Sequence, residues 1–365
     1  MNAARRTLAT MASSRMKSWF PTTSHPLIVS APMDFVTNSR LATEVTKAGG
    51  LGFIQGGRDF APESPVLKKL DEQLTQARDL LGASASSSVL PLGVAFVMYT
   101  ATARHFGTTA VPILAQYRPA AVWLFAPSPT APDTISAVIK ALKSAGGEWT
   151  PKVVVQVGSV AAAREAATHG ADVIVAQGVD AGGHQWASGA GVVSLVPEIA
   201  DMLREEFPSM EIAVWAAGGI ADGRGVAAAL ALGAEGVVLG TRYMVATESS
   251  AQDFKRKVIL GTSDGGANTV KSQLHDQVQG NMSWPDLYDG RAIVTPTYQD
   301  HRAGVPLDEN AKRLKMAKEA GDTSRAVTWS GTGVGLVKEE LPAAEITKRV
   351  RDGALKAIAG LQSSL

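Results

Sequence analysis

The chain has 365 residues, 45% of them hydrophobic, which is enough to bury a large core in one barrel or in two smaller domains. Its 35 basic and 34 acidic residues leave a net charge of +1, so we expect no nucleic-acid partner and no membrane-surface partner. The chain contains no cysteine, which excludes disulfides, thiolate metal sites and a cysteine nucleophile.

The N-terminus is basic and free of acidic residues up to Met33, with Arg5, Arg6, Arg15 and Lys17 among small polar residues. We therefore predict that residues 1–20 form a flexible tail or a weak targeting segment. A cytoplasmic location is expected, and mitochondrial import is the alternative that this basic segment leaves open. The sequence has no run of about 18 apolar residues, so we expect no membrane span.

From residue 27 onward, short β-branched runs alternate with alanine-rich helical runs. Strands are predicted at Leu27–Ala31, Leu51–Ile54, Leu92–Val97, Ala120–Phe125, Lys152–Val157, Asp172–Gln177, Ile212–Ala216 and Gly236–Leu239. Helices are predicted at Ser39–Ala48, Glu63–Leu81, Ala101–Gln116, Pro132–Ser144, Val160–Thr168, Leu195–Glu206 and Gly223–Leu232. The strands are apolar throughout, as in parallel sheets buried on both faces. The pattern predicts an α/β protein whose residues 21–250 form a (β/α)8 TIM barrel, with a doubly wound sheet as the alternative.

Residues 251–330 break this rhythm because they are polar and rich in turn residues. The stretch is too long for an ordinary loop, so we expect either a lid on the substrate side or a disordered insertion. Residues 331–365 contain an amphipathic pattern at Ala343–Leu361, which predicts a terminal helix that packs on the barrel.

A glycine-rich motif at Ala216–Gly223 lies between the seventh strand and its helix, with Asp222 placed to cap that helix. A second motif, Val238-Leu239-Gly240-Thr241, ends the eighth strand. Loops after these two strands of a TIM barrel often bind a phosphate, so Gly218, Gly219 and the second motif predict a mononucleotide phosphate site. The alternative is that barrel turns contain glycine for purely structural reasons.

A second candidate segment, Gln177–His184, follows the sixth strand at the face where barrel enzymes carry their catalytic groups. Gln177 could bond the edge of a ring, Gly182 and Gly183 would let a flat ring lie against the backbone, and His184 would project from this loop toward that ring. An ordinary, non-functional histidine is the alternative. Weaker candidates end two other strands: Ala31, Pro32 and Met33 after the first, and Gln156 on the fifth.

The barrel and its phosphate motifs would also suit inosine-monophosphate dehydrogenase. That chemistry requires a cysteine nucleophile, which this chain lacks.

These motifs together resemble the nitronate monooxygenase family, formerly called 2-nitropropane dioxygenases, over about two-thirds of the chain. The residues that carry the resemblance are Ala31–Met33, Ala48–Gly52, Gln177–His184, Gly218–Asp222 and Gly240–Arg242, and Asp289-Gly290-Arg291 is similar to fungal members. The resemblance implies FMN as cofactor and O2 as oxidant, with an alkyl nitronate or a nitroalkane converted to a carbonyl compound and nitrite. It also implies that His184 is catalytic, that Gln177, Gly182, Gly219 and Val238–Thr241 contact FMN, and that Ala31–Met33 lie near the flavin ring. A homodimer is compatible with this sequence.

One residue departs from the family pattern. Many relatives have Gly-Val-Asn in the third strand, where this chain has Gly93-Val94-Ala95, and Ala95 cannot make the hydrogen bond of that asparagine to FMN. Two other interpretations therefore stay open. One is an NAD(P)H-dependent flavin reductase, similar to enoyl-acyl-carrier-protein reductase or NADH:quinone reductase. The other is a flavin-binding member without turnover on nitro compounds.

Overall fold

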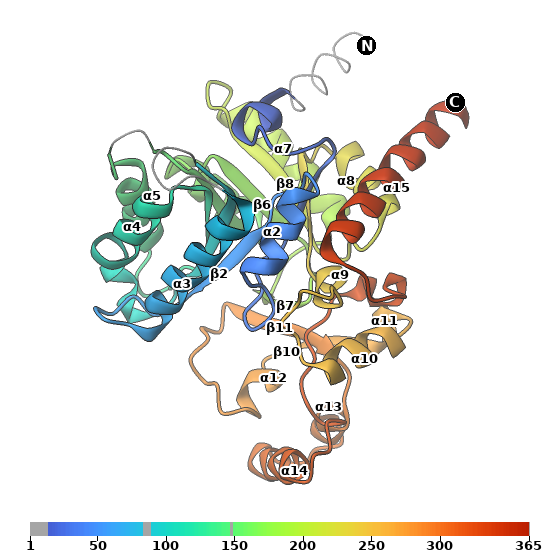
Figure 1. The fold of residues 1–365 in the computed structure, drawn as a ribbon. Coiled ribbons are helices and arrows are strands. Elements are labelled where there is room, and N and C mark those ends of the chain that lie inside the picture. The colour runs from blue at the N-terminus through green and yellow to red at the C-terminus, as the bar shows by residue number, and fades with distance from the viewer. Residues whose placement is uncertain (1–13, 83–88, 147–148, 365) are drawn as a thin grey trace.

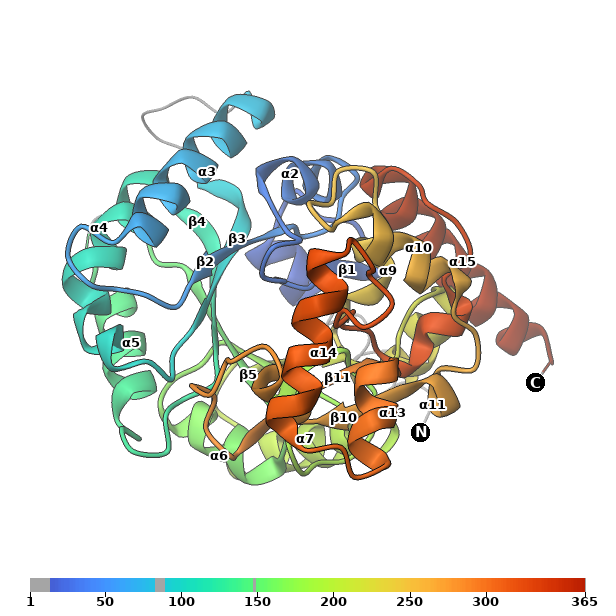
Figure 2. The same ribbon diagram turned by 90° about the horizontal axis from the view of Figure 1, so that it is seen from below.

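The computed structural model describes residues 14–82, 89–146 and 149–364, and its main feature is a closed ring of eight parallel strands (Figures 1 and 2). Hydrogen-bonded pairing follows the order β1-β9-β8-β6-β5-β4-β3-β2, and a parallel bridge between Val29 and Leu51 joins the two ends. The strands are β1 (Leu27–Ser30), β2 (Phe53–Gly57), β3 (Leu90–Val97), β4 (Pro119–Phe125), β5 (Lys152–Val157), β6 (Val173–Gln177), β8 (Ala213–Ala217) and β9 (Gly236–Leu239). The predicted TIM barrel is confirmed.

Helices surround this ring on its outer side (Figure 2). They are α2 (Ser39–Lys47), α3 (Pro65–Leu81), η1 (Ala101–His105), α4 (Phe106–Tyr117), α5 (Thr134–Lys143), α6 (Val160–Thr168), α7 (Val192–Glu206) and α8 (Gly223–Ala231). The predicted bounds of β5, α6 and β9 agree with the structure, and the other elements shift by a few residues. Helix α15 (Ala343–Ser364) packs against α8 and α2, so it covers the barrel between the last and first of these helices.

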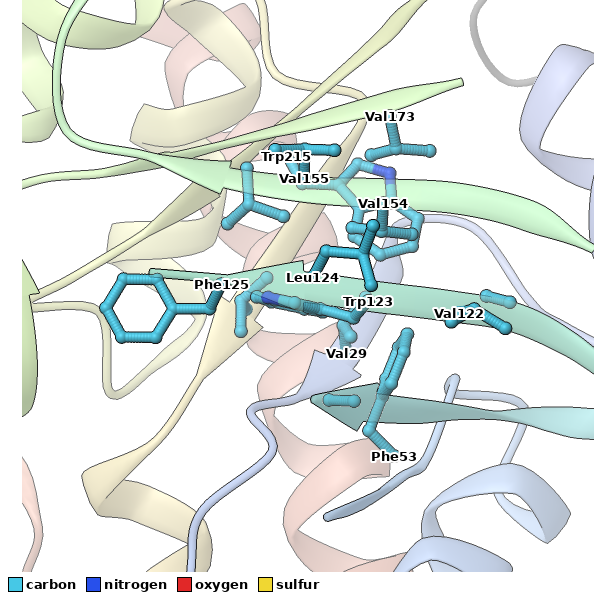
Figure 3. Packing of buried hydrophobic residues seen from close by; sticks show 14 of the residues in the cluster. Val29, Phe53, Val122, Trp123, Leu124, Phe125, Val154, Val155, Val173 and Trp215 are labelled. Atoms are coloured by element: carbon cyan, nitrogen blue, oxygen red, sulfur yellow. The ribbon is translucent and has the colours of Figure 1, made fainter. Parts of the chain in front are cut away.

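Aromatic rings fill the barrel interior (Figure 3). The Phe53 ring lies 5.1 Å from Trp123 and 6.5 Å from Trp215, and these residues come from strands β2, β4 and β8, which are not neighbours in the sheet. Contact between non-adjacent strands is only available inside the ring. The barrel is therefore a packed core and not a pore, as in other folds of this kind.

Residues 14–20 do not form the flexible tail that was one of the two expectations for this end of the chain. Residues 14–19 are helical, and Met16 and Phe20 are each 2% exposed. Trp215 Nε1 donates to Met16 Sδ at 3.5 Å, and Arg15 Nε donates to Glu235 Oε2 at 2.9 Å. Because Glu235 directly precedes β9, this segment closes the N-terminal end of the barrel. Burying these apolar side chains outweighs the basic, polar composition on which the prediction rested. Residues 1–13 lie outside the described residues.

The stretch at 251–330, called the extension below, is ordered structure and not a disordered insertion. It contains α10 (Asp253–Gly261), α11 (Gly265–Asn268), β10 (Thr269–Ser272), α12 (Leu274–Gln277), β11 (Tyr288–Ile293), α13 (Pro296–Arg302) and α14 (Leu307–Glu319). Strand β11 pairs antiparallel with β10 and with β7 (Gly183–Trp186), so the segment expected to be a loop around His184 is a strand (Figure 1). The partner of β7 in this pairing, β11, lies about a hundred residues further along the chain, so the local sequence pattern around His184 could not reveal the strand.

The extension lies at the C-terminal ends of the barrel strands. Tyr288 Oη donates to the carbonyl of Pro127 after β4, and Arg291 donates twice to the carbonyl of Val179 after β6. Within the described residues, no helix is long and apolar enough to cross a membrane, and no cluster of three or more acidic or histidine side chains has the arrangement of a metal site.

Candidate active site

Gln177 ends strand β6 at the mouth of the barrel, and only one of the two polar atoms of its side-chain amide has a hydrogen-bond partner. Its Nε2 donates to the backbone carbonyl of His184 at 3.2 Å, whereas its buried Oε1 has no hydrogen-bond partner among the described residues. A buried acceptor without a partner costs free energy unless a ligand satisfies it. Gln177 therefore points to a bound group that donates a hydrogen bond.

The two glycines before His184 have different surroundings. A Cβ on Gly182 would lie 2.4 Å from the backbone of Ser330 and Gly331, so this glycine packs against protein. Gly183 has φ +69° and nothing within 4 Å of the position of a Cβ. Of the two glycines, Gly183 is the one with open space at its Cβ position, where a flat ring could lie, and the contact of Gly182 with FMN stays a prediction.

His184 lies on β7 and has neighbours on three sides. Its Nε2 lies 2.8 Å from Asp276 Oδ2. One face of its ring stacks on Trp284, with centroids 3.9 Å apart and an interplanar angle of 10°, and Trp329 lies 4.8 Å away, tilted by 51°. The buried Nε1 of Trp284 has no partner within the described chain. An unsatisfied donor thus lies beside the histidine.

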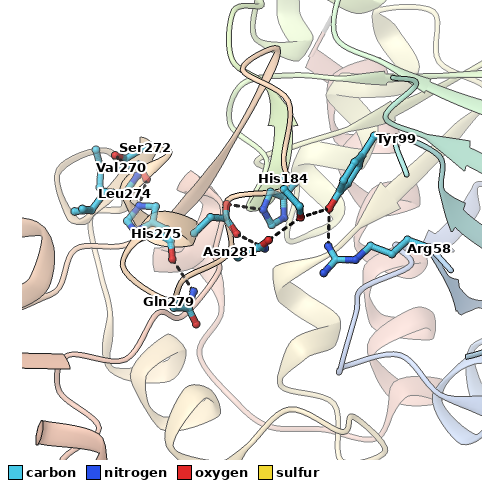
Figure 4. A network of polar contacts seen from close by, with 11 residues as sticks. Arg58, Tyr99, His184, Val270, Ser272, Leu274, His275, Gln279 and Asn281 are labelled. Atoms are coloured by element: carbon cyan, nitrogen blue, oxygen red, sulfur yellow. Dashed lines mark hydrogen bonds and ion pairs between the residues drawn. The ribbon is translucent and has the colours of Figure 1, made fainter. Parts of the chain in front are cut away.

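A chain of hydrogen bonds continues from Asp276 across the barrel mouth (Figure 4). Asn281 Nδ2 donates to Asp276 Oδ1 at 3.0 Å, and Ser283 Oγ donates to Asn281 Oδ1 at 2.8 Å. Ser283 then meets Tyr99 Oη at 3.0 Å, and Arg58 donates to the same Oη at 2.9 Å. Arg58 and Tyr99 follow β2 and β3, so this chain connects the extension to the opposite side of the barrel.

Several acids and one further histidine surround this chain. Burial raises the pKa of Asp34, although Arg58 acts against that rise. Burial also raises the pKa of Asp289, opposed by Lys271, and lowers the pKa of His275. His184 lies close enough to each of these three groups to lower that group's pKa through space.

The phosphate motif has the backbone geometry that glycine permits. Gly218 and Gly219 have φ angles of +114° and +72°, and Asp222 caps α8 by accepting from the backbone N–H groups of Arg224 and Gly225. The predicted capping role of Asp222 is confirmed. Backbone amides and a helix N-terminus thus come together at the end of β8, as a phosphate site requires.

The end of β9 lies beside the end of β1. Ala31 N donates to the carbonyl of Leu239 at 2.9 Å, and Met33 Sδ lies 3.7 Å from the position of a Cβ on Gly240. Pro32 sits between them in sequence. The side chains of Val238 and Leu239 are buried in the barrel wall, so only their backbone could contact a ligand.

Two predicted residues make contacts that the sequence did not indicate. Thr241 Oγ1 accepts from the backbone N–H of Gly331 at 3.0 Å, and Gln156 Oε1 accepts from Trp123 Nε1 at 3.0 Å. Their remaining polar atoms stay available to a ligand. Because all the predicted site residues follow or end β1, β5, β6, β8 and β9, the structure gathers them at one end of the barrel.

Sequence reasoning missed the side chains that surround His184. These are Asp276, Trp284 and Trp329, together with Asn281, which bonds Asp276, and all four belong to the extension. Sequence reasoning also did not single out Gln55, a polar residue on β2 in register with Ala95. Gln55 follows the inward-facing Phe53 by two positions, so alternation points it into the same interior. Glutamine on a strand near its C-terminal end was the one available signal.

Comparison with known proteins agrees with this architecture. The family described as "NMO: Nitronate monooxygenase" matches residues 107–352. The chain is 51% identical to a nitronate monooxygenase of Neurospora crassa, covering 97% of this chain and 96% of the relative. It is 38% identical to the nitronate monooxygenase npaC of Metarhizium robertsii, covering 92% of each chain. Among solved structures, FabK from Thermotoga maritima superposes with a TM-score of 0.71 at 25% identity, covering 96% of this chain and 99% of that one. This chain belongs to the nitronate monooxygenase family.

Proposed function

We propose that this protein uses FMN to oxidise alkyl nitronates with O2, giving a carbonyl compound and nitrite, and that it accepts nitroalkanes after removal of their α-proton. The observation that carries the proposal is the 51% identity, over nearly the full length, to a relative named nitronate monooxygenase. The polar and aromatic surroundings of His184 supply a place where that chemistry could occur.

The residues at the barrel mouth fit FMN. The unpartnered Oε1 of Gln177 would accept from the flavin ring, and the open side of Gly183 would face that ring. The backbone of Gly218, Gly219, Gly240 and Thr241 would hold the phosphate. When bound, FMN supplies the acceptor for electrons from the nitronate and passes them to O2.

His184 would act on the substrate in one of two ways. With a neutral nitroalkane, its free ring nitrogen takes the α-proton, a kind of base catalysis that contributes typically about 10²–10⁴-fold. With a nitronate, which has no such proton to lose, the protonated ring holds the negatively charged nitro oxygens. Trp284 and Trp329 pack against the ring and shield part of it from bulk water, which leaves its side chain 19% exposed.

The test is the absorption spectrum of the FMN-loaded protein under anaerobic conditions. We expect an alkyl nitronate to bleach the flavin and NADH to leave it oxidised. Rapid bleaching by NADH, with none by the nitronate, would identify a flavin reductase instead.

A His184→Ala variant tests the assigned residue. We expect its nitrite release from a nitroalkane to fall by at least about 100-fold, in line with the loss of a general base. Unchanged nitrite release would remove His184 from the mechanism and favour a non-catalytic role for this segment.

A further inference from the structure

We propose that Asp276 is a positioning residue that fixes His184 with its proton on Nε2, so that Nδ1 is the nitrogen that takes the substrate proton. The inference rests on the proposed function. It assigns a catalytic contribution to the extension.

The hydrogen bond to Asp276 determines where the proton of neutral His184 resides. Asp276 Oδ2 lies 2.8 Å from Nε2, and the carboxylate side chain is only 8% exposed. An ionised carboxylate can only accept hydrogen bonds, so Nε2 must carry the proton. No described residue bonds Nδ1, which leaves its lone pair for a substrate.

The ring cannot exchange the places of its nitrogen and carbon atoms without losing its hydrogen bond to Asp276. Trp284 stacks on one face at 3.9 Å and Trp329 lies 4.8 Å from the ring centroid. These contacts fix the plane of the ring. A 180° flip within that plane would place Cε1 where Nε2 now meets Asp276 and would break that bond. Packing therefore sets the ring plane and the bond to Asp276 selects the flip state, as in a preorganised site.

Asp276 is itself held in place by the extension and by the barrel. Its Oδ1 accepts from Asn281 Nδ2 at 3.0 Å, and its backbone carbonyl accepts from the N–H groups of Gln279 and Asn281. Through Ser283, this turn reaches Tyr99 after β3. The carboxylate thus has both oxygens occupied and little freedom to leave the histidine.

The proton transfer that follows is balanced. The α-carbon of the nitroalkane loses its proton to His184 Nδ1, and the C–H electron pair becomes the C=N bond of the nitronate, whose charge spreads over the nitro oxygens. The imidazolium formed is stabilised by the negative charge of Asp276. The other titratable groups near His184 are Asp34, Asp289 and His275, and none of them bonds its ring.

The experiment compares Asp276→Asn with Asp289→Asn in the FMN-loaded protein. Both variants remove one negative charge near His184, but Asp289 pairs with Lys271 and does not bond the ring. The kcat/KM values for nitroethane and for preformed ethyl nitronate are measured across pH. For Asp276→Asn we expect a 10- to 100-fold loss with nitroethane and a much smaller loss with ethyl nitronate. We also expect the pH at half-maximal nitroethane turnover to fall, because the charge that favours the protonated ring is gone.

A double variant separates positioning from general damage. If Asp276 acts only through His184, Asp276→Asn should cost nothing further in a His184→Ala background. Equal losses on both substrates together with lost FMN, or a pH profile like that of Asp289→Asn, would overturn the inference. Failure of the wild-type protein to oxidise either substrate would instead overturn the proposed function.

A measurement on the wild-type protein covers the case in which Asp276→Asn does not fold. The ¹⁵N spectrum of neutral His184 should show the proton on Nε2. A proton on Nδ1 would contradict the assignment.

Discussion

We expect Gln177→Met to stabilise the apoprotein but to weaken FMN binding, because the amide oxygen of Gln177 has no partner until FMN binds. Without FMN, the substitution removes a buried unsatisfied acceptor, which relieves about 1–3 kcal/mol. It also removes the bond from Nε2 to the His184 carbonyl, which contributes about 0.5–1.5 kcal/mol. The apoprotein should therefore be stabilised by about 1 kcal/mol, as measured by denaturant unfolding.

With FMN the same substitution should weaken binding. A flavin N–H that loses its buried acceptor costs about 1–3 kcal/mol. At about 1.4 kcal/mol per factor of ten, the Kd for FMN rises roughly 10- to 100-fold. Titration of the apoprotein with FMN, followed by quenching of flavin fluorescence, measures this change.

Gln185 provides the matched control for this experiment. It also has a buried Oε1 without a partner, and its Nε2 also donates to a backbone carbonyl, that of Ala181 at 2.7 Å. Gln185→Met should therefore change apoprotein stability similarly but leave the Kd for FMN unchanged. The reasoning is refuted if Gln177→Met binds FMN as tightly as the wild type, or if Gln185→Met is the variant that loses affinity.

Two further predictions concern stability. In Gly52→Ala the new Cβ would lie 1.9 Å from the carbonyl oxygen of Ala42, so we expect destabilisation of about 3 kcal/mol or more in denaturant unfolding. The control is Gly261→Ala, whose new Cβ would have nothing within 4 Å and should change the unfolding free energy little. Asp222→Ala should cost about 1 kcal/mol at pH 7 through loss of the α8 cap. Burial alone would raise the pKa of Asp222, but bonds from Arg224 and from backbone N–H groups hold it below its usual range. The stabilisation by Asp222 is thus present above about pH 3.9 and is lost as the pH falls through the lower folded-state pKa. A difference in unfolding free energy between Asp222→Ala and the wild type that persists unchanged at pH 2 would contradict this account.

The barrel was predictable because its signals are local. Strand β5 and helix α6 are consecutive, and each shows its own periodicity within a few residues. Gln177 could be proposed for the same reason, since it ends a strand at the face where barrels carry their sites. Met16 was not found, because burial of its side chain depends on Trp215, nearly two hundred residues away in sequence.

The partners of His184 could not be predicted because they depend on one long-range pairing. His184 is in register with Gly290, and that pairing carries the extension to the barrel mouth. The Asp289-Gly290-Arg291 motif, noted in the sequence only for its resemblance, acts at this junction. A Cβ on Gly290 would lie 2.4 Å from the Trp329 ring, and Arg291 donates two hydrogen bonds, of 3.1 and 3.0 Å, to the Val179 carbonyl. The motif thus lets Trp329 approach His184 while it ties β11 to the segment that follows β6. A short motif can therefore support a side chain, here the histidine proposed as the base, that lies a hundred residues earlier.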